Sequence, residues 1–240
     1  MELDVSNNTA LTELMCEHNI LTELNVSKNI SIIKLRCDNN ELTKLDISNN
    51  TALTHLNCRV NELSALDVSN NTALEELHCG ENYLTTLDVS KNTALIELDC
   101  DENQLKELDV TRNIALKRLY CSNNDLTEMD VSKNTALGCL FCRQNQLTTL
   151  DVSRNSVLSW LYCGSNKLTA LHVSNNSELA LLYCGGNQLA TDALNALFET
   201  LHDETIPDWD KLDKTVGVYD NPGAETCDRS IAERKGWTVE

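Results

Sequence analysis

Residues 95–115, LIELDCDENQLKELDVTRNIA, decide the fold, because the same pattern returns along most of the chain. The pattern is L-x-x-L-x-C-x-x-N-x-L-x-x-L-D-V-S-x-N-x-x, and it repeats every 21 residues. A fixed period of this length is typical of a solenoid, in which each repeat forms one turn. The repeated cysteines are Cys16, Cys37, Cys58, Cys79, Cys100, Cys121, Cys142, Cys163 and Cys184.

Both halves of the repeat predict extended structure. Around Leu98 and Cys100 apolar and polar residues alternate, as they do in a strand with one buried face. The second half, around Leu108 and Val110, alternates in the same way and leaves no room for a return helix. We therefore expect a right-handed, gently curved solenoid of mostly parallel β structure, with a short extended or irregular convex side. Two columns of asparagine are expected to bond the backbone at the turns.

We divide the chain into a solenoid at residues 1–189, made of a partial first repeat and nine 21-residue repeats, and a C-terminal cap at residues 190–240. After Asn187 the second half of the repeat fails. A helix capped by Thr191 or Asp192 is expected instead, with an apolar stripe that ends at Leu201. The rest of this small α+β cap is predicted as a polar loop through Pro207, a strand at 215–219, a turn at 221–223, a second short helix at about 228–235 and closing residues 237–239.

The sequence resembles the leucine-rich repeat pattern. Its 21-residue form, with cysteine in a leucine position, is similar to the internalin J type of bacterial surface protein. The resemblance covers residues 1 to about 189. It implies an extracellular or cell-surface location and a role in adhesion or host interaction.

The charge of the chain argues against several partners. There are 37 acidic residues against 19 basic ones, which gives a net charge of −18. Such a field repels nucleic acid and anionic lipid. No apolar run is long enough to insert in a membrane, and no signal sequence follows Met1. We expect a protein or glycan ligand, and we expect that the uncapped N-terminal end can self-associate.

Two repeated columns have alternative chemical interpretations. The cysteine column predicts small buried side chains rather than disulfides or a zinc site, because isolated inward-facing thiols lack the required pairing. Cys139, outside this column, should face solvent, and Cys227 should be buried in the cap. The acidic column predicts hydrogen bonds to nearby turn amides and serines, with a calcium ladder as the alternative. Its members are Asp4, Asp46, Asp67, Asp88, Asp109, Asp130 and Asp151.

Aromatic residues gather where a ligand could bind. Only 4% of the chain is aromatic, yet five such side chains fall on outward strand positions in the last four repeats. An exposed patch of this kind predicts a binding surface, whereas an aromatic ladder that braces the sheet is the alternative. The predicted ligand-binding residues are Arg118, Tyr120, Phe141, Arg143, Trp160, Tyr162, Leu181 and Tyr183.

A second cluster lies on the same face in the middle of the chain. It contains His55 and His78 among carboxylates, including Glu76, Glu97 and Asp99. Histidines beside acids could bind a metal or act as an acid–base pair, but a solvated acidic face is the interpretation that we favour. A nearly flat sheet offers no enclosed pocket, so we predict no catalytic residues, no metal and no cofactor.

The sequence thus predicts a non-enzymatic recognition module that binds a protein or glycan through the strand face near its C-terminal end. A structural spacer with no ligand is the first alternative. A metal-assisted hydrolase at the histidine cluster is the second.

Overall fold

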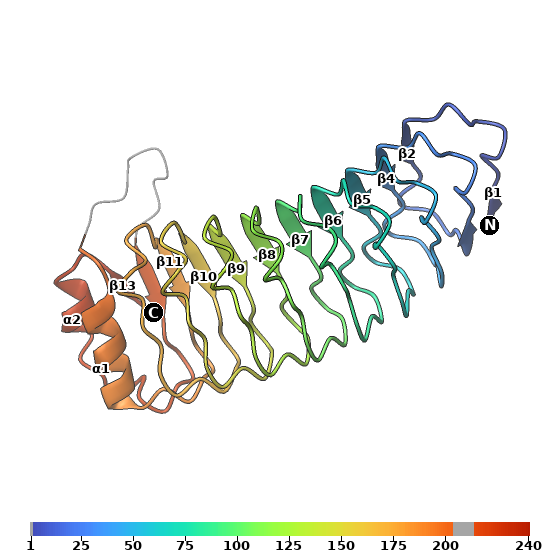
Figure 1. The fold of residues 1–240 in the computed structure, drawn as a ribbon. Helices are drawn as coiled ribbons and strands as arrows, with labels where there is room; N and C mark the ends of the chain where they lie inside the picture. The colour runs from blue at the N-terminus through green and yellow to red at the C-terminus, as the bar shows by residue number, and fades with distance from the viewer. Residues whose placement is uncertain (1, 204–213) are drawn as a thin grey trace. The chain divides into compact units, whose positions relative to one another are not determined.

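The computed structural model describes residues 2–203 and 214–240, and it is a parallel β-solenoid (Figure 1). It forms two compact units, which we call the N-terminal unit (Met1–Leu116 with Asn123–Asp125) and the C-terminal unit (Lys117–Ser122 with Leu126–Glu240). Each repeat contributes one short strand to the same wall of the coil. In the N-terminal unit these are β2 (Glu13–Met15), β4 (Lys34–Arg36), β5 (His55–Asn57), β6 (Glu76–His78) and β7 (Glu97–Asp99), and in the C-terminal unit β8 (Arg118–Tyr120), β9 (Cys139–Phe141), β10 (Trp160–Tyr162) and β11 (Leu181–Tyr183).

Within each unit the strands pair in parallel without a shift of register. In the N-terminal unit Leu56 pairs with Leu77, and in the C-terminal unit Leu140 pairs with Leu161. These leucines point inward and are buried, as are the cysteines two residues later. Because side chains alternate across a strand, the residues on either side of each leucine point outward and form two rows.

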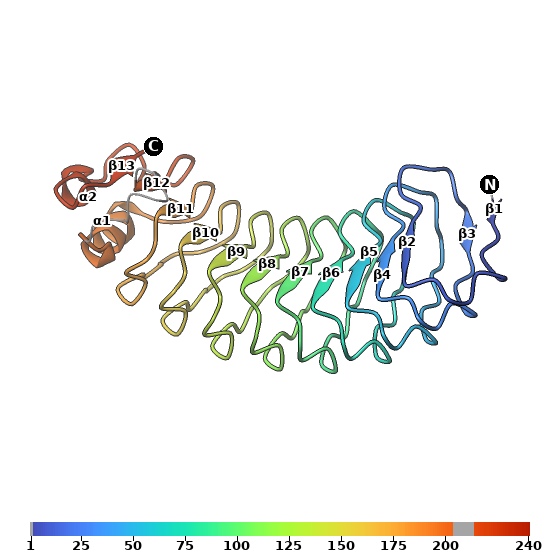
Figure 2. The ribbon, with the colours of Figure 1, turned by 90° about the horizontal axis from the view of Figure 1, so that it is seen from above.

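The second half of the repeat is mostly irregular. Among the described residues it forms strand only at β1 (Glu2–Leu3) and β3 (Glu23–Leu24), which pair in parallel. Figure 2 shows these return segments as loops on the wall away from β4–β11. The convex side is therefore short and irregular over most of its length, one of the two forms that the sequence predicts.

Both asparagine columns bond one turn to the next. Asn82 donates from Nδ2 to the carbonyl oxygens of Cys58 and Cys79, each at 3.1 Å, and its Oδ1 accepts the Leu63 N–H at 3.0 Å. The same bonds recur at Asn221 in the cap, where Oδ1 accepts the Leu189 N–H at 3.0 Å. Asn221 therefore extends the column by one turn beyond the predicted cap boundary.

The cap contains helix α1 (Thr191–Thr200), strand β12 (Thr215–Gly217), helix α2 (Ser230–Glu233) and strand β13 (Thr238–Val239). Strand β12 continues the sheet by pairing with β11, as predicted. The predicted N-cap at Thr191 or Asp192 is wrong, because Ala190 occupies that position and the Thr191 hydroxyl bonds Thr226 instead.

Helix α2 is shorter than predicted, and Cys227 is half-buried rather than buried. The predicted loop through Pro207 lies outside the described residues. The cap is fastened by Lys235, whose Nζ donates to the carbonyl oxygens of Glu199 at 2.6 Å and Leu201 at 2.8 Å at the end of α1. This is the favourable place for a cation at a helix C-terminus.

Candidate functional site

The strands of the C-terminal unit place the predicted site residues in two adjacent rows. Register pairs Arg118 with Cys139 and Trp160 with Leu181 in the first row. We call the second row, formed by Tyr120, Phe141, Tyr162 and Tyr183, the aromatic row. Arg143 follows Cys142 and is exposed beside this row.

Neighbouring rings of the aromatic row are in contact: Phe141, Tyr162 and Tyr183 are stacked, and Tyr120 is tilted by 41° against Phe141. Ring centroids lie 5.1 Å apart for Tyr120 and Phe141, 4.3 Å for Phe141 and Tyr162, and 4.8 Å for Tyr162 and Tyr183. The middle pair is nearly parallel, at 9° between ring planes. These spacings follow the distance between parallel strands, which is about 4.8 Å. Stacked pairs of this kind contribute about 0.5–1.5 kcal/mol each beyond their burial.

Stacking leaves mainly the ring edges of Phe141 and Tyr162 for a ligand. Phe141 and Tyr162 each have a neighbouring ring on both sides. All four side chains of the row are half-buried, so the predicted exposed patch is smaller than the sequence indicates. Trp160 is also half-buried, but it stacks on no ring among the described residues, so its ring face is not used by a neighbouring aromatic side chain.

Two further tyrosine contacts, at the capped end of the row, were missed from the sequence. A Cβ built on Gly217 would lie 2.5 Å from Cδ1 of Tyr183, and one on Gly185 would lie 2.7 Å from Cε2 of Tyr219. Both glycines therefore give room for a tyrosine ring, and Tyr219 keeps 52% of its surface exposed. Glycine at an outward strand position is a sign of such close approach, and Gly217 carries that sign in the sequence.

The pKa values of two tyrosines in the aromatic row, Tyr162 and Tyr183, are raised. Burial raises the pKa of Tyr162, with a further contribution from Tyr183, while Arg143 opposes the shift. Burial also raises the pKa of Tyr183, and Glu240 adds to this shift. The phenol groups are therefore neutral hydrogen-bonding groups at physiological pH. Cys139 is half-buried in the neighbouring row rather than fully solvent-facing.

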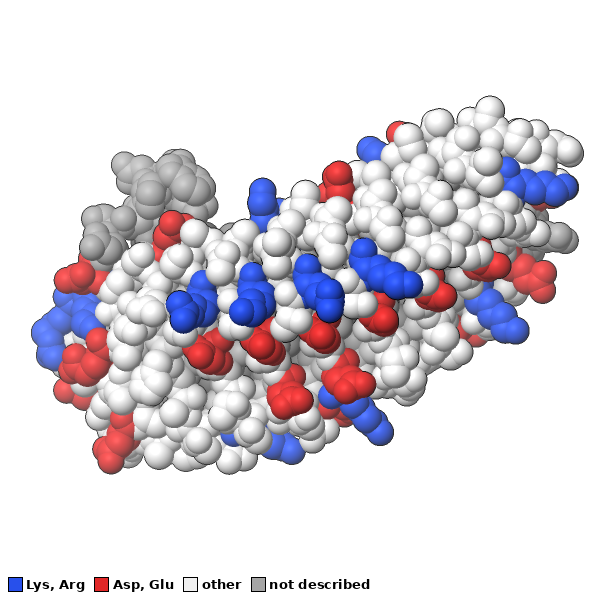
Figure 3. All heavy atoms as spheres, in the orientation of Figure 1, with Lys and Arg blue, Asp and Glu red and all other residues white. Residues whose placement is uncertain are grey.

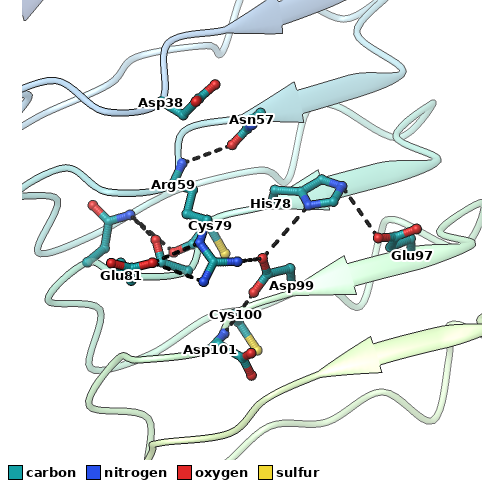
Figure 4. Close-up of polar contacts among 12 residues, drawn as sticks. Asp38, Asn57, Arg59, His78, Cys79, Glu81, Glu97, Asp99, Cys100 and Asp101 are labelled. Atoms are coloured by element: carbon teal, nitrogen blue, oxygen red, sulfur yellow. Dashed lines mark hydrogen bonds and ion pairs between the residues drawn. The ribbon is translucent and has the colours of Figure 1, made fainter. Parts of the chain in front are cut away.

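The outward rows of the N-terminal unit contain an ion-pair network instead (Figure 4). Arg59 donates to Oδ2 of Asp99 at 2.6 Å and to Oε1 of Glu81 at 3.0 Å. His78 lies 3.8 Å from the carboxylates of both Asp99 and Glu97. Contact with Asp99 raises the pKa of His78, and Glu97 adds to the shift although burial opposes it.

The prediction of a solvated acidic face is wrong at Asp99, which is only 4% exposed. Its Oδ1 accepts the Asp101 N–H at 3.1 Å and lies against Gly80, where a Cβ would be 2.8 Å away. Arg59 was missed because it lies in the turn after β5, two repeats before Asp99 in sequence. Across the described residues, no group of three or more His, Cys, Asp or Glu side chains is arranged to hold a metal ion.

The cysteine column is free of disulfides and buried. Burial raises the pKa of Cys58 and Cys184 to about 12 and that of Cys16 to about 11. These thiols are therefore protonated at neutral pH and are poor nucleophiles.

The aspartate column is stabilised locally, as predicted. In each turn the carboxylate accepts the N–H two residues later, for example Asp67 from Ser69 at 2.8 Å and Asp130 from Ser132 at 2.9 Å. This bond lowers the pKa of both aspartates. Figure 3 shows regular rows of acidic and basic side chains on one face. Lys91 lowers the pKa of Asp67 further, and Lys133 does the same for Asp130.

A family model described as the LVIVD repeat matches residues 37–57, which is the length of one repeat. No curated protein sequence matches the chain. No helix in the described ranges is long and apolar enough to cross a membrane.

Solved structures with this fold include the functional domain of InlJ from Listeria monocytogenes, whose structure contains a cysteine ladder. The two sequences are 37% identical with a TM-score of 0.85 over 98% of this chain, and the chain spans half the length of the InlJ structure. A leucine-rich repeat protein of Leptospira interrogans is 20% identical, with a TM-score of 0.70 over all of this chain and 75% of that one. The leucine-rich effector YopM from Yersinia pestis is 24% identical, with a TM-score of 0.65 over 89% of this chain and 56% of that one.

Folds of this kind are typically non-enzymatic scaffolds, and they generally mediate protein binding. The 21-residue period, the buried free cysteines and the match to InlJ agree with one another. The chain is a leucine-rich repeat solenoid protein of the cysteine-ladder type, similar to InlJ.

Proposed function

We propose that the chain is a recognition module of a bacterial surface or secreted protein, and that it binds its ligand through the strand face of the C-terminal unit. The observation that carries this proposal is the aromatic row, with Trp160 beside it. Tyrosine and tryptophan are enriched among residues that dominate binding energy, because they offer a large apolar area and a polar group. Arg118 and Arg143 border the rows and can orient a polar ligand.

The geometry of the row favours a protein ligand over a glycan. Sugar rings bind aromatic side chains mainly through free ring faces, whereas stacked rings occupy both faces of Tyr162 and one face of Phe141, and Tyr120 lies tilted against the other. The row instead offers ring edges, which carry partial positive charge, and neutral phenol groups. Backbone carbonyls and carboxylates of a protein surface complement these groups. Among structures of this fold, the leucine-rich repeat ectodomain of the plant receptor kinase GASSHO1 was solved in complex with CASPARIAN STRIP INTEGRITY FACTOR 2.

Adhesion or host interaction is the role that we propose for this recognition. The test is binding of the fluorescently labelled chain to cultured epithelial cells, before and after Trp160→Ala and Tyr162→Ala. We expect each variant to lower the affinity for cells by about thirtyfold, since central aromatic residues typically contribute about 2 kcal/mol to an interface.

A matched control is Met15→Ala, because Met15 occupies the same repeat position in β2 as Tyr162 does in β10 and is 58% exposed. Thermal unfolding of every variant confirms that the fold is kept. Cell binding that is equal in all variants would show that the rings only brace the sheet, as a spacer requires.

A further inference from the structure

A groove of about 360 Å³ lies in the second half of the repeats, away from the outward rows of the strands. It runs between two successive turns of the C-terminal unit, and Leu150 and Leu171 are among its lining residues, at 7% and 2% exposed. Its volume falls within the range of about 300–1,000 Å³ of small-molecule sites. We call it the threonine groove, and its defining residues are Thr148, Thr149, Asp151, Thr169, Ala170 and His172.

The side chains that line the groove are short at two successive turns. The two positions before the second leucine are Thr148 and Thr149 in one turn, and Thr169 and Ala170 in the next. In the two preceding turns these positions include Lys106, Glu107 and Glu128, whereas two successive turns of the N-terminal unit are equally short, with Ser64, Ala65, Thr85 and Thr86. Short side chains leave the space between these turns open, and His172, which replaces the repeated aspartate, sets these turns apart from the turns at 64–65 and 85–86.

A second departure from the repeat leaves a backbone donor beside the groove. At Asp151 the side chain accepts the N–H of Ser153 at 2.9 Å, as aspartates of this column do in other turns. His172 stands in the aspartate position of the next turn, and the Ser174 N–H finds no acceptor within the described residues. Ser174 lines the groove, so a bound hydroxyl or carbonyl oxygen can take the place of the missing carboxylate.

The turn that carries this donor is fixed in place by the cap. Thr200, in the last turn of helix α1, accepts the Val173 N–H on its Oγ1 at 3.2 Å. Figure 2 shows α1 beside the last turns of the C-terminal unit. A site that is held before the ligand arrives loses less entropy on binding.

The chemistry of the lining selects the ligand. Hydroxyl groups of threonines and serines surround an apolar floor, to which Met129 contributes. No lysine or arginine lines the groove, and its one carboxylate belongs to Asp151. An anionic ligand is disfavoured by that carboxylate and by the net charge of −18. A sugar ring combines an apolar C–H face with a polar rim of hydroxyls, which matches this floor and these rims. We propose that the threonine groove binds a neutral oligosaccharide.

The experiment tests the full chain on a printed array that holds neutral and acidic oligosaccharides, followed by titration of the tightest neutral sugar. The double variant Thr149→Glu/Ala170→Glu fills the groove with the side chain that Glu107 and Glu128 already place at this repeat position, so the fold should tolerate it. We expect it to weaken neutral-sugar binding by about tenfold or more, because the polar partners become unreachable. Thr86→Glu makes the same change at the same repeat position outside the groove and should leave binding unchanged.

His172→Asp gives a finer test. It should restore the carboxylate that accepts the Ser174 N–H, and it should weaken sugar binding severalfold by removing that donor. Trp160→Ala should have no effect on sugar binding. This variant therefore distinguishes failure of the aromatic-row proposal from failure of the groove proposal. The proposal is overturned if no neutral sugar binds, if acidic sugars alone bind, or if the groove-filling variant binds as tightly as Thr86→Glu.

Discussion

The strand faces of the two units use the same positions of the same repeat for different chemistry. In the N-terminal unit the outward residue before the cysteine is His78 or Asp99, and these side chains join an ion-pair network with Arg59. In the C-terminal unit the same position holds Phe141 or Tyr162, which stack at 4.3 Å. The framework fixes where the side chains lie, and the side chains decide whether neighbouring turns are joined by charge or by ring contact.

Removal of the Arg59 guanidinium from the N-terminal network should cause the largest loss in the free energy of unfolding. Arg59→Ala leaves the buried carboxylate of Asp99 without its 2.6 Å partner. Breaking a buried pair costs about 3–5 kcal/mol, and the lower end, about 3 kcal/mol, applies here because Arg59 is partly exposed. The free energy of unfolding from a urea titration measures this loss.

The matched control for that change is the double variant Arg59→Ala/Asp99→Asn, which removes the unpaired charge as well. It should recover much of the lost stability, because a neutral amide is cheaper to bury than a carboxylate. A single Arg59→Ala variant as stable as the parent would mean that water supports Asp99 and that the network adds nothing to the fold.

Removal of the Phe141 ring from the aromatic row should cause a smaller loss in the free energy of unfolding. Phe141→Ala deletes two ring contacts, to Tyr120 and Tyr162, and uncovers part of the strand. We expect a loss of about 2 kcal/mol in the urea titration, below the cost for a fully buried ring, because Phe141 is half-buried. Phe141→Leu keeps most of the apolar volume and should lose about half as much. Equal stability of all three proteins would show that the stack does not brace this unit.

The contrast between the units was only partly predictable from the sequence. The 21-residue period fixes the register, so it places Phe141 beside Tyr162 and His78 beside Asp99 without any structure. It could not give the burial of Asp99, because that depends on Arg59 reaching across two turns and on the missing side chain of Gly80. The sequence also could not predict the tilt and stacking of the rings, since side-chain rotation is not set by the repeat. The sequence also could not single out the threonine groove, because Ser64, Ala65, Thr85 and Thr86 are equally short at the same repeat positions.

The smallest predicted effect is a pH dependence confined to the N-terminal network. Asp99 and Glu97 raise the pKa of His78 above its ordinary value of 6.5, with Glu76 contributing and with the Arg59 guanidinium on the far side of Asp99. A raised pKa means that the folded protein binds the proton more tightly than the unfolded chain does. The stabilisation is therefore complete below about pH 6.5 and is lost as the pH rises through the pKa of the folded state. Its size should stay below about 1 kcal/mol, as for a partly exposed ion pair.

Urea titrations between pH 5.5 and 8.5 can isolate this contribution by comparing the parent chain with His78→Gln. The parent should lose stability relative to His78→Gln as the pH rises, because only the parent can bind the extra proton in the folded state. His172→Gln is the matched control, since it makes the same substitution at an exposed histidine outside the N-terminal network. If His78→Gln and the parent have the same slope, the contacts of His78 with Asp99 and Glu97 do not stabilise its proton in the folded protein. The N-terminal face would then be a fixed ion-pair network, as insensitive to pH as the aromatic row.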